Sequence, residues 1–97
     1  MNKEEYFNEV VNVITELTEV SKESIVSSSR EADVVDARWI TIRLLKESGF
    51  STKQIVPLIG HKRRTIDHAM MMLDDRIKYS YNGIGNILAT ARQLLFK

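Results

Sequence analysis

The sequence predicts an all-α fold of five or six helices in a single domain, 1–97. Apolar residues recur at steps of three and four in its long segments, the period of an amphipathic helix. No segment alternates apolar and polar residues as a half-buried strand does. Short stretches rich in serine or glycine separate the helical segments, and 97 residues can form one modest hydrophobic core.

The first half predicts two long helices and a short one. The first, 3–20, has a single apolar stripe: Phe7, Val10, Val11, Ile14 and Leu17. A turn or two of helix is expected near Ile25 and Val26, and the serines 27–29 form a linker that can cap the next helix. That helix, 31–48, has apolar positions Val34, Val35, Trp39, Ile42 and Leu45, and Gly49 ends it.

The second half predicts three helices. Ser51 and Gln54 form a capping-box pattern that opens a helix over 51–59, which Pro57 bends or shortens and Gly60 ends. A clear helix follows at 63–78, with apolar residues Ile66, Ala69, Met70, Leu73 and Ile77. A turn at 79–86 then leads to a closing helix over 86–97, whose stripe is Ile87, Leu88, Ala91, Leu94 and Leu95.

Composition argues against several classes of protein. There is no cysteine, which excludes disulfides and Cys-based zinc sites, and two histidines alone do not make a metal site. No pair of acids and no nucleophile with a neighbouring base stands out, so we expect no enzyme, no cofactor and no metal. The polar, acidic start and the lack of a membrane-length apolar run predict a soluble, cytoplasmic protein.

Charge is distributed unevenly along the chain. Residues 1–36 carry nine acids and three bases, a net charge of −6. Residues 37–97 carry four acids and eleven bases, a net charge of +7. This asymmetry indicates a face that binds a polyanion, and the acidic 1–20 helix is a candidate surface for a second copy or a partner protein.

Three cations stand where a helix is expected to begin. Because the macrodipole places partial positive charge at a helix start, Lys62, Arg63 and Arg64 oppose it there. They favour an anionic ligand at a helix-turn-helix over 51–78 whose second helix enters the DNA major groove. We expect base contacts from Arg63, Arg64 and Thr65. The expected phosphate contacts are Arg38, Thr52, Lys53, His61 and Lys62.

The stretch from about 10 to 78 resembles the C-terminal DNA-binding domain of the bacterial replication initiator DnaA, a Trp-repressor-like fold. The family's S-x-x-E-I segment matches Ser51-Thr52-Lys53-Gln54-Ile55, which precedes Gly60. Its recognition helix, roughly D-H-T-T-V-x-H-A, matches Lys62-Arg63-Arg64-Thr65-Ile66-Asp67-His68-Ala69. Of its R-Q-x-A segment, only the arginine is kept, as Arg38. The closing helix, 86–97, is loosely similar.

The resemblance implies binding of double-stranded DNA, in replication control or transcription regulation. In the family the D-H-T positions read bases, and the cations here imply a different DNA sequence. No G-x-x-x-x-G-K-[ST] loop is present, so the initiator's ATPase module has no counterpart. The alternative function is a protein-interaction adaptor that keeps the fold without binding DNA. In that case the basic cluster is a solvated loop, and His68 packs or hydrogen-bonds beside Asp67.

Overall fold

The computed structural model describes residues 1–79 and 83–96, and it confirms the predicted all-α class. The helices are α1 (Lys3–Thr18), α2 (Lys22–Ile25), α3 (Ala32–Glu47), α4 (Thr52–Ile59), α5 (Arg63–Tyr79) and α6 (Ile84–Leu95). The part of the chain that the structure describes contains no strand. None of its helices has both the length and the apolar character needed to cross a membrane.

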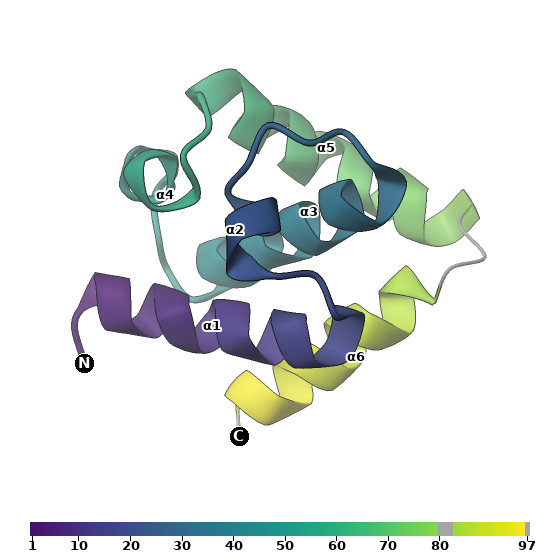
Figure 1. Ribbon diagram of the computed structural model, residues 1–97, viewed down its shortest axis with the longest axis horizontal. Helices are drawn as coiled ribbons and strands as arrows, with labels where there is room; N and C mark the ends of the chain where they lie inside the picture. Colours follow the sequence, from purple (N-terminus) through teal and green to yellow (C-terminus); the bar gives the residue numbers. More distant parts are fainter. Residues whose placement is uncertain (80–82, 97) are drawn as a thin grey trace.

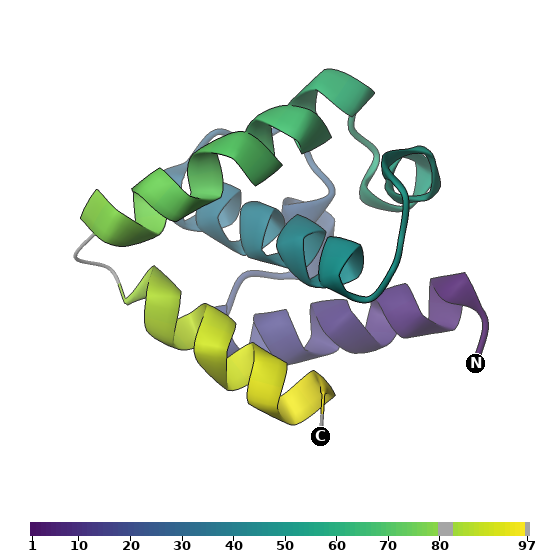
Figure 2. The same cartoon turned by 180° about the vertical axis from the view of Figure 1, so that it is seen from behind.

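Helix α3 lies at the centre of the fold (Figure 1). Helix α5 packs on one side of it and α1 on the other, with α6 against α1 (Figures 1 and 2). The short α4 packs at the start of α5, and α2 lies against α3. This arrangement leaves the outer side of α5 and the turn before it at the surface.

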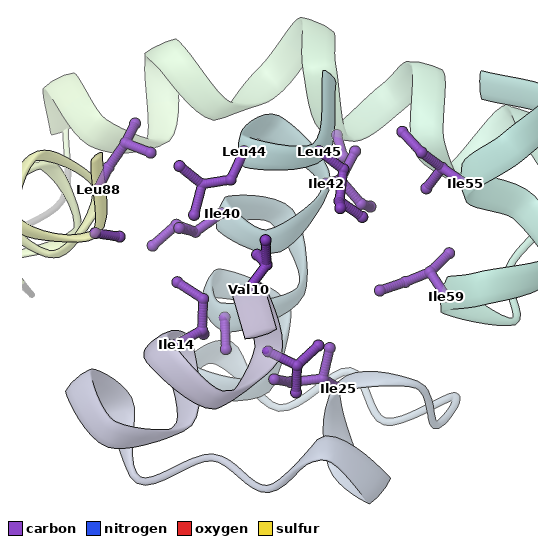
Figure 3. Close-up of a cluster of buried hydrophobic side chains, with 14 of the residues drawn as sticks. Val10, Ile14, Ile25, Ile40, Ile42, Leu44, Leu45, Ile55, Ile59 and Leu88 are labelled. Carbon is purple, nitrogen blue, oxygen red and sulfur yellow. The ribbon is translucent and has the colours of Figure 1, made fainter. Parts of the chain in front are cut away.

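One hydrophobic core joins all six helices (Figure 3). Helix α3 supplies its centre, with Ile40, Ile42, Leu44 and Leu45 fully buried. The predicted stripes of α1 and α5 face this centre. Their buried residues are Phe7, Val10, Val11, Ile14, Ile66, Ala69 and Leu73.

The predicted capping box of α4 and the predicted glycine ends of α3 and α4 are confirmed. The Ser51 hydroxyl accepts from the Gln54 backbone N–H at 3.2 Å, and the Gln54 side chain accepts from the Ser51 N–H at 2.9 Å. This capping box starts α4, and Gly60 ends it with a φ of 72°. Gly49, with a φ of 97°, follows the end of α3. Both glycines adopt left-handed backbone conformations that other residues rarely adopt.

Three predictions about helix ends are wrong. Helix α1 ends at Thr18 rather than at residue 20, because Glu19 adopts a left-handed conformation at its C-cap position. Helix α6 begins at Ile84, two residues before the expected start, because Gly83 in a left-handed conformation occupies its N-cap position. The expected turn at 79–86 is therefore helical at both ends, while its residues 80–82 lie outside the described part. The serine linker does not cap α3, whose N-cap is Glu31 and has no side-chain capping bond.

Helix α3 differs from the single-stripe helix expected there. It is buried over most of its circumference, and Asp36, Arg38 and Arg43 are buried together with its apolar residues. Trp39, expected in the stripe, is only half-buried. A charge inside a central helix must be paired or hydrogen-bonded to remain there. Through their polar contacts, these three charged residues hold the loop before α3 and the helix α5 against α3.

Candidate functional site

The basic start of α5 is exposed. Lys62, Arg63 and Arg64 all lie at the surface. The Lys62 carbonyl accepts from the backbone N–H of Thr65 at 3.0 Å and of Ile66 at 3.3 Å, so Lys62 occupies the cap position of α5. Since a lysine side chain has no acceptor, it cannot bond the free N–H groups of the first turn. Those groups and the three cations together can bind an anion.

Arg63 and Arg64 remain available to a ligand. The Arg63 Nε atom lies 3.7 Å from an Asp67 carboxylate oxygen, one helical turn away. Both side chains are well exposed, at 81% and 58%, and such surface pairs contribute little to stability. Arg64 borders two hollows, one on the outer side of α5 with Arg63 and one between α5 and α3. Thr65 borders only the second.

Polar contacts with α3 fix α5 in place. The Arg43 guanidinium donates to the Asp74 carboxylate at 3.0 Å and to the Met70 carbonyl at 3.2 Å. Near the other end of α3, the Arg76 guanidinium donates to the buried Asp36 carboxylate. These contacts join the second half of α5 to α3, while buried Ile66 and Ala69 pack its first half on the core.

His68 has a packing partner that its sequence position does not reveal. The expectation for a non-functional His68 was packing or a hydrogen bond beside Asp67. Its ring packs edge-on against the Trp39 ring, with centroids 5.5 Å apart, which agrees with packing and identifies a partner on α3. The Arg76 guanidinium lies 5.4 Å from the centroid of the same indole. Trp39 therefore packs between two polar side chains of α5 at the edge of the core, where it is half-buried.

Arg38 is not at the surface as a phosphate contact requires. It is only 4% exposed, and its guanidinium donates to four carbonyl oxygens of the segment that precedes α3. The bonds run from Nε to Ile25 at 2.7 Å and from the terminal nitrogens to Ser29 at 3.0 Å, Ser27 at 2.8 Å and Ser24 at 3.3 Å. Burial lowers the pKa of Arg38, yet arginine stays protonated at neutral pH. The expectation that Arg38 contacts phosphate is therefore wrong. Its four hydrogen bonds instead hold this segment on α3.

The other expected phosphate contacts fall into two groups. Lys53 and Lys62 are exposed and therefore accessible to a ligand. His61 is half-buried, and its Nε2 donates to the Ser27 carbonyl at 2.7 Å, so only Nδ1 remains for another partner. The Thr52 hydroxyl accepts from the Lys46 ammonium group at 2.6 Å, which occupies part of its bonding capacity.

The segment around 27–30 joins the site, which the sequence did not predict. The bonds from Arg38 and His61 to its carbonyls hold it between α3 and the start of α5. As a result Arg30 and Arg64, which come from different parts of the chain, border the same hollow. Arg30 is one of three bases in the acidic stretch 1–36, and its charge alone does not reveal this placement.

The comparisons with known proteins identify no relative. No protein-family model, no curated protein and no solved structure matches the chain. Among residues 1–79 and 83–96, no three His, Asp or Glu side chains are grouped so as to hold a metal ion.

Proposed function

We propose that this chain binds double-stranded DNA through the start of α5. The observation that carries the proposal is the exposure of Lys62, Arg63 and Arg64 at the start of a helix that the core and two ion pairs join to α3. Such cations oppose the helix dipole in the free protein, and a bound polyanion removes that conflict. DNA supplies both phosphates and guanine bases, which arginine bonds in a bidentate way.

The relation between α4 and α5 supports a helix-turn-helix mode. Residues 60–62 are all that separates the two helices, and Gly60 makes the turn. In Figures 1 and 2, α4 is seen end-on whereas α5 lies lengthwise across the view. A steep crossing of this kind is typical of helix-turn-helix pairs, in which the start of the second helix enters the major groove.

The proposed roles divide the basic surface. Arg63, Arg64 and Thr65 read bases, while Lys53 and Lys62 bind phosphates, with His61 and Thr52 at the edge of the contact. The resemblance of 10–78 to the DnaA C-terminal domain supports the same surface and suggests replication control or transcription regulation. The loss of the family's D-H-T residues implies that the target differs from the family's own.

DNA binding should weaken steeply as salt rises. Each neutralised phosphate releases counterions, which gives a slope of log K against log salt of about −0.9 per phosphate. With roughly four to five contacts, we expect a slope of about −4 for a monomer. Fluorescence anisotropy with a labelled duplex at several salt concentrations measures it. A slope near zero would contradict DNA binding through this surface.

Base reading and phosphate contact should separate by mutation. Arg64→Ala should weaken binding to the preferred site by about 1–3 kcal/mol and relax one base position. Lys53→Ala should weaken binding to all sequences to about the same extent, because phosphates are common to all of them. A binding-site selection on random duplex DNA, repeated with each variant, compares the two. Identical effects of the two changes would mean that the chain binds DNA without reading it.

Exposed apolar side chains favour the adaptor as the second candidate. Met1 is 81% exposed and Phe96 is 42% exposed, and both border one hollow beside α1. Leu94, on the last turn of α6, is 46% exposed. An apolar patch, or the acidic surface of α1, can bind a second copy or a partner protein. A gel shift at low and moderate salt separates the candidates, since an adaptor without DNA binding retards no duplex at either salt concentration.

A further inference from the structure

A groove with a volume of about 640 Å³ lies between the 27–30 segment, α3 and the start of α5. Arg30 lies on the first wall, and Arg64 and Thr65 lie on the α5 wall. Val35 and Trp39 of α3 form an apolar floor. The volume falls in the range of about 300–1,000 Å³ that is typical of sites for small molecules.

The cations of the groove differ in availability. Arg38 bonds to carbonyls and Arg76 to the Asp36 carboxylate, so their charges are already compensated. Arg30 and Arg64 are exposed, and within residues 1–79 and 83–96 neither has a carboxylate at ion-pair distance. The described residues that line the groove include no Asp or Glu. Its electrostatic character therefore favours an anionic group between the two free arginines.

The floor indicates what else the ligand must contain. Trp39 is half-buried and is fixed by contacts with His68 and Arg76, while Val35 is half-buried beside it. A phosphate ion between Arg30 and Arg64 would leave this apolar surface exposed to water. A ligand with an anionic end and a planar, weakly polar body would cover it and gain stacking and packing contacts.

We propose that this groove binds a nucleoside monophosphate as a ligand distinct from duplex DNA. Because Arg64 and Thr65 belong to both proposed sites, the nucleotide and the duplex compete for them. Arg30 and Arg64 hold the phosphate from opposite walls, and the Thr65 hydroxyl donates a hydrogen bond to it. The nucleoside packs over Val35 and the accessible edge of Trp39. The segment that carries Arg30 is fixed by Arg38 and His61, so the two phosphate-binding arginines are held in position before the ligand enters.

The fluorescence of Trp39 can report nucleotide binding directly, because Trp39 is the sole tryptophan of the chain. We expect adenosine monophosphate to change its fluorescence in a saturable way. Adenosine, which lacks the anionic group, should bind roughly tenfold more weakly or worse, because it loses the charge-assisted contacts. Inorganic phosphate, which lacks the nucleoside, should also bind roughly tenfold more weakly or worse, because it leaves the apolar floor exposed to water. No response to adenosine monophosphate, or equal binding of either fragment, would overturn the proposal.

Two variants and a control locate the ligand. Arg30→Gln and Arg64→Gln should each weaken binding of adenosine monophosphate about tenfold, and circular dichroism checks that both remain folded. Lys53→Gln, at an exposed position of α4 outside the groove, should leave nucleotide affinity unchanged while weakening duplex binding. Unchanged nucleotide affinity in both arginine variants would overturn the proposal. Nucleotide binding without any duplex binding would contradict only the DNA proposal, so the two can fail separately.

Discussion

Arg38→Met should lower the free energy of unfolding by about 3 kcal/mol, because four backbone carbonyls lose their donor. Each buried carbonyl left without a partner costs about 1–3 kcal/mol, and water reaches some of them at the edge of the segment. Methionine keeps much of the side-chain volume, so the loss reports hydrogen bonds rather than a cavity. Urea denaturation followed by circular dichroism measures the change.

Arg30→Met is the matched control for this prediction. Arg30 lies in the same segment but is exposed, so its replacement should change stability by no more than about 0.5 kcal/mol. Hydrogen exchange adds a local measurement: in Arg38→Met the amides of 24–31 should exchange faster, while those of α1 keep their relative protection. If Arg38→Met were as stable as the control, the hydrogen bonds of Arg38 would not be what holds the segment on α3.

The sequence predicted the helices whose signals are local. The apolar stripe of α1, the Ser51–Gln54 capping box and the left-handed glycines at 49 and 60 act within a few residues of chain. Period and turn chemistry are therefore sufficient to place those elements. The sequence places the start of the last helix two residues late, because a glycine in a polar stretch indicates a turn as readily as a helix cap.

The roles of the charges on α3 could not be predicted in the same way. Arg38 bonds to carbonyls of the segment before α3, and Asp36 and Arg43 pair with Arg76 and Asp74 of α5. The two α3–α5 ion pairs join residues 40 and 31 positions apart, a separation that no local pattern detects. One signal was nevertheless present: Ile40 and Leu44 lie outside the expected stripe of α3. Apolar residues around a helix indicate burial on all sides, and charges on such a helix need partners.

The sequence indicates which cations of the candidate site are exposed, but it does not indicate the groove beside them. Lys53, Lys62, Arg63 and Arg64 are exposed as a DNA contact requires. Lys62 lies in the short turn at the surface, and the other three lie in the first turns of α4 and α5, outside the apolar positions of those helices. The groove beside Trp39 depends on how the 27–30 segment folds over α3. That fold depends on the carbonyl bonds of Arg38, so the groove could be found only from the structure.

Lys62→Asp should change folding and DNA binding in opposite directions. Lys62 occupies the cap position of α5, where a carboxylate can accept from the N–H groups of the first turn and complement the dipole. We expect the free protein to gain about 1 kcal/mol of stability. On DNA the same carboxylate faces phosphates, and like charges in contact cost several kcal/mol, so affinity should fall by roughly a hundredfold.

Lys62→Asn separates the cap from the charge. Asparagine caps a helix about as well as aspartate but carries no charge, so it should stabilise the free protein nearly as much. Its loss of DNA affinity should be about tenfold or less, because one favourable contact disappears without any repulsion replacing it. Thermal melting and one duplex titration of each variant measure both effects. A destabilised Lys62→Asp protein with unchanged DNA affinity would make the basic cluster structural. Greater stability with weaker binding would instead indicate that the cluster is kept for its ligand, at some loss of stability to the free protein.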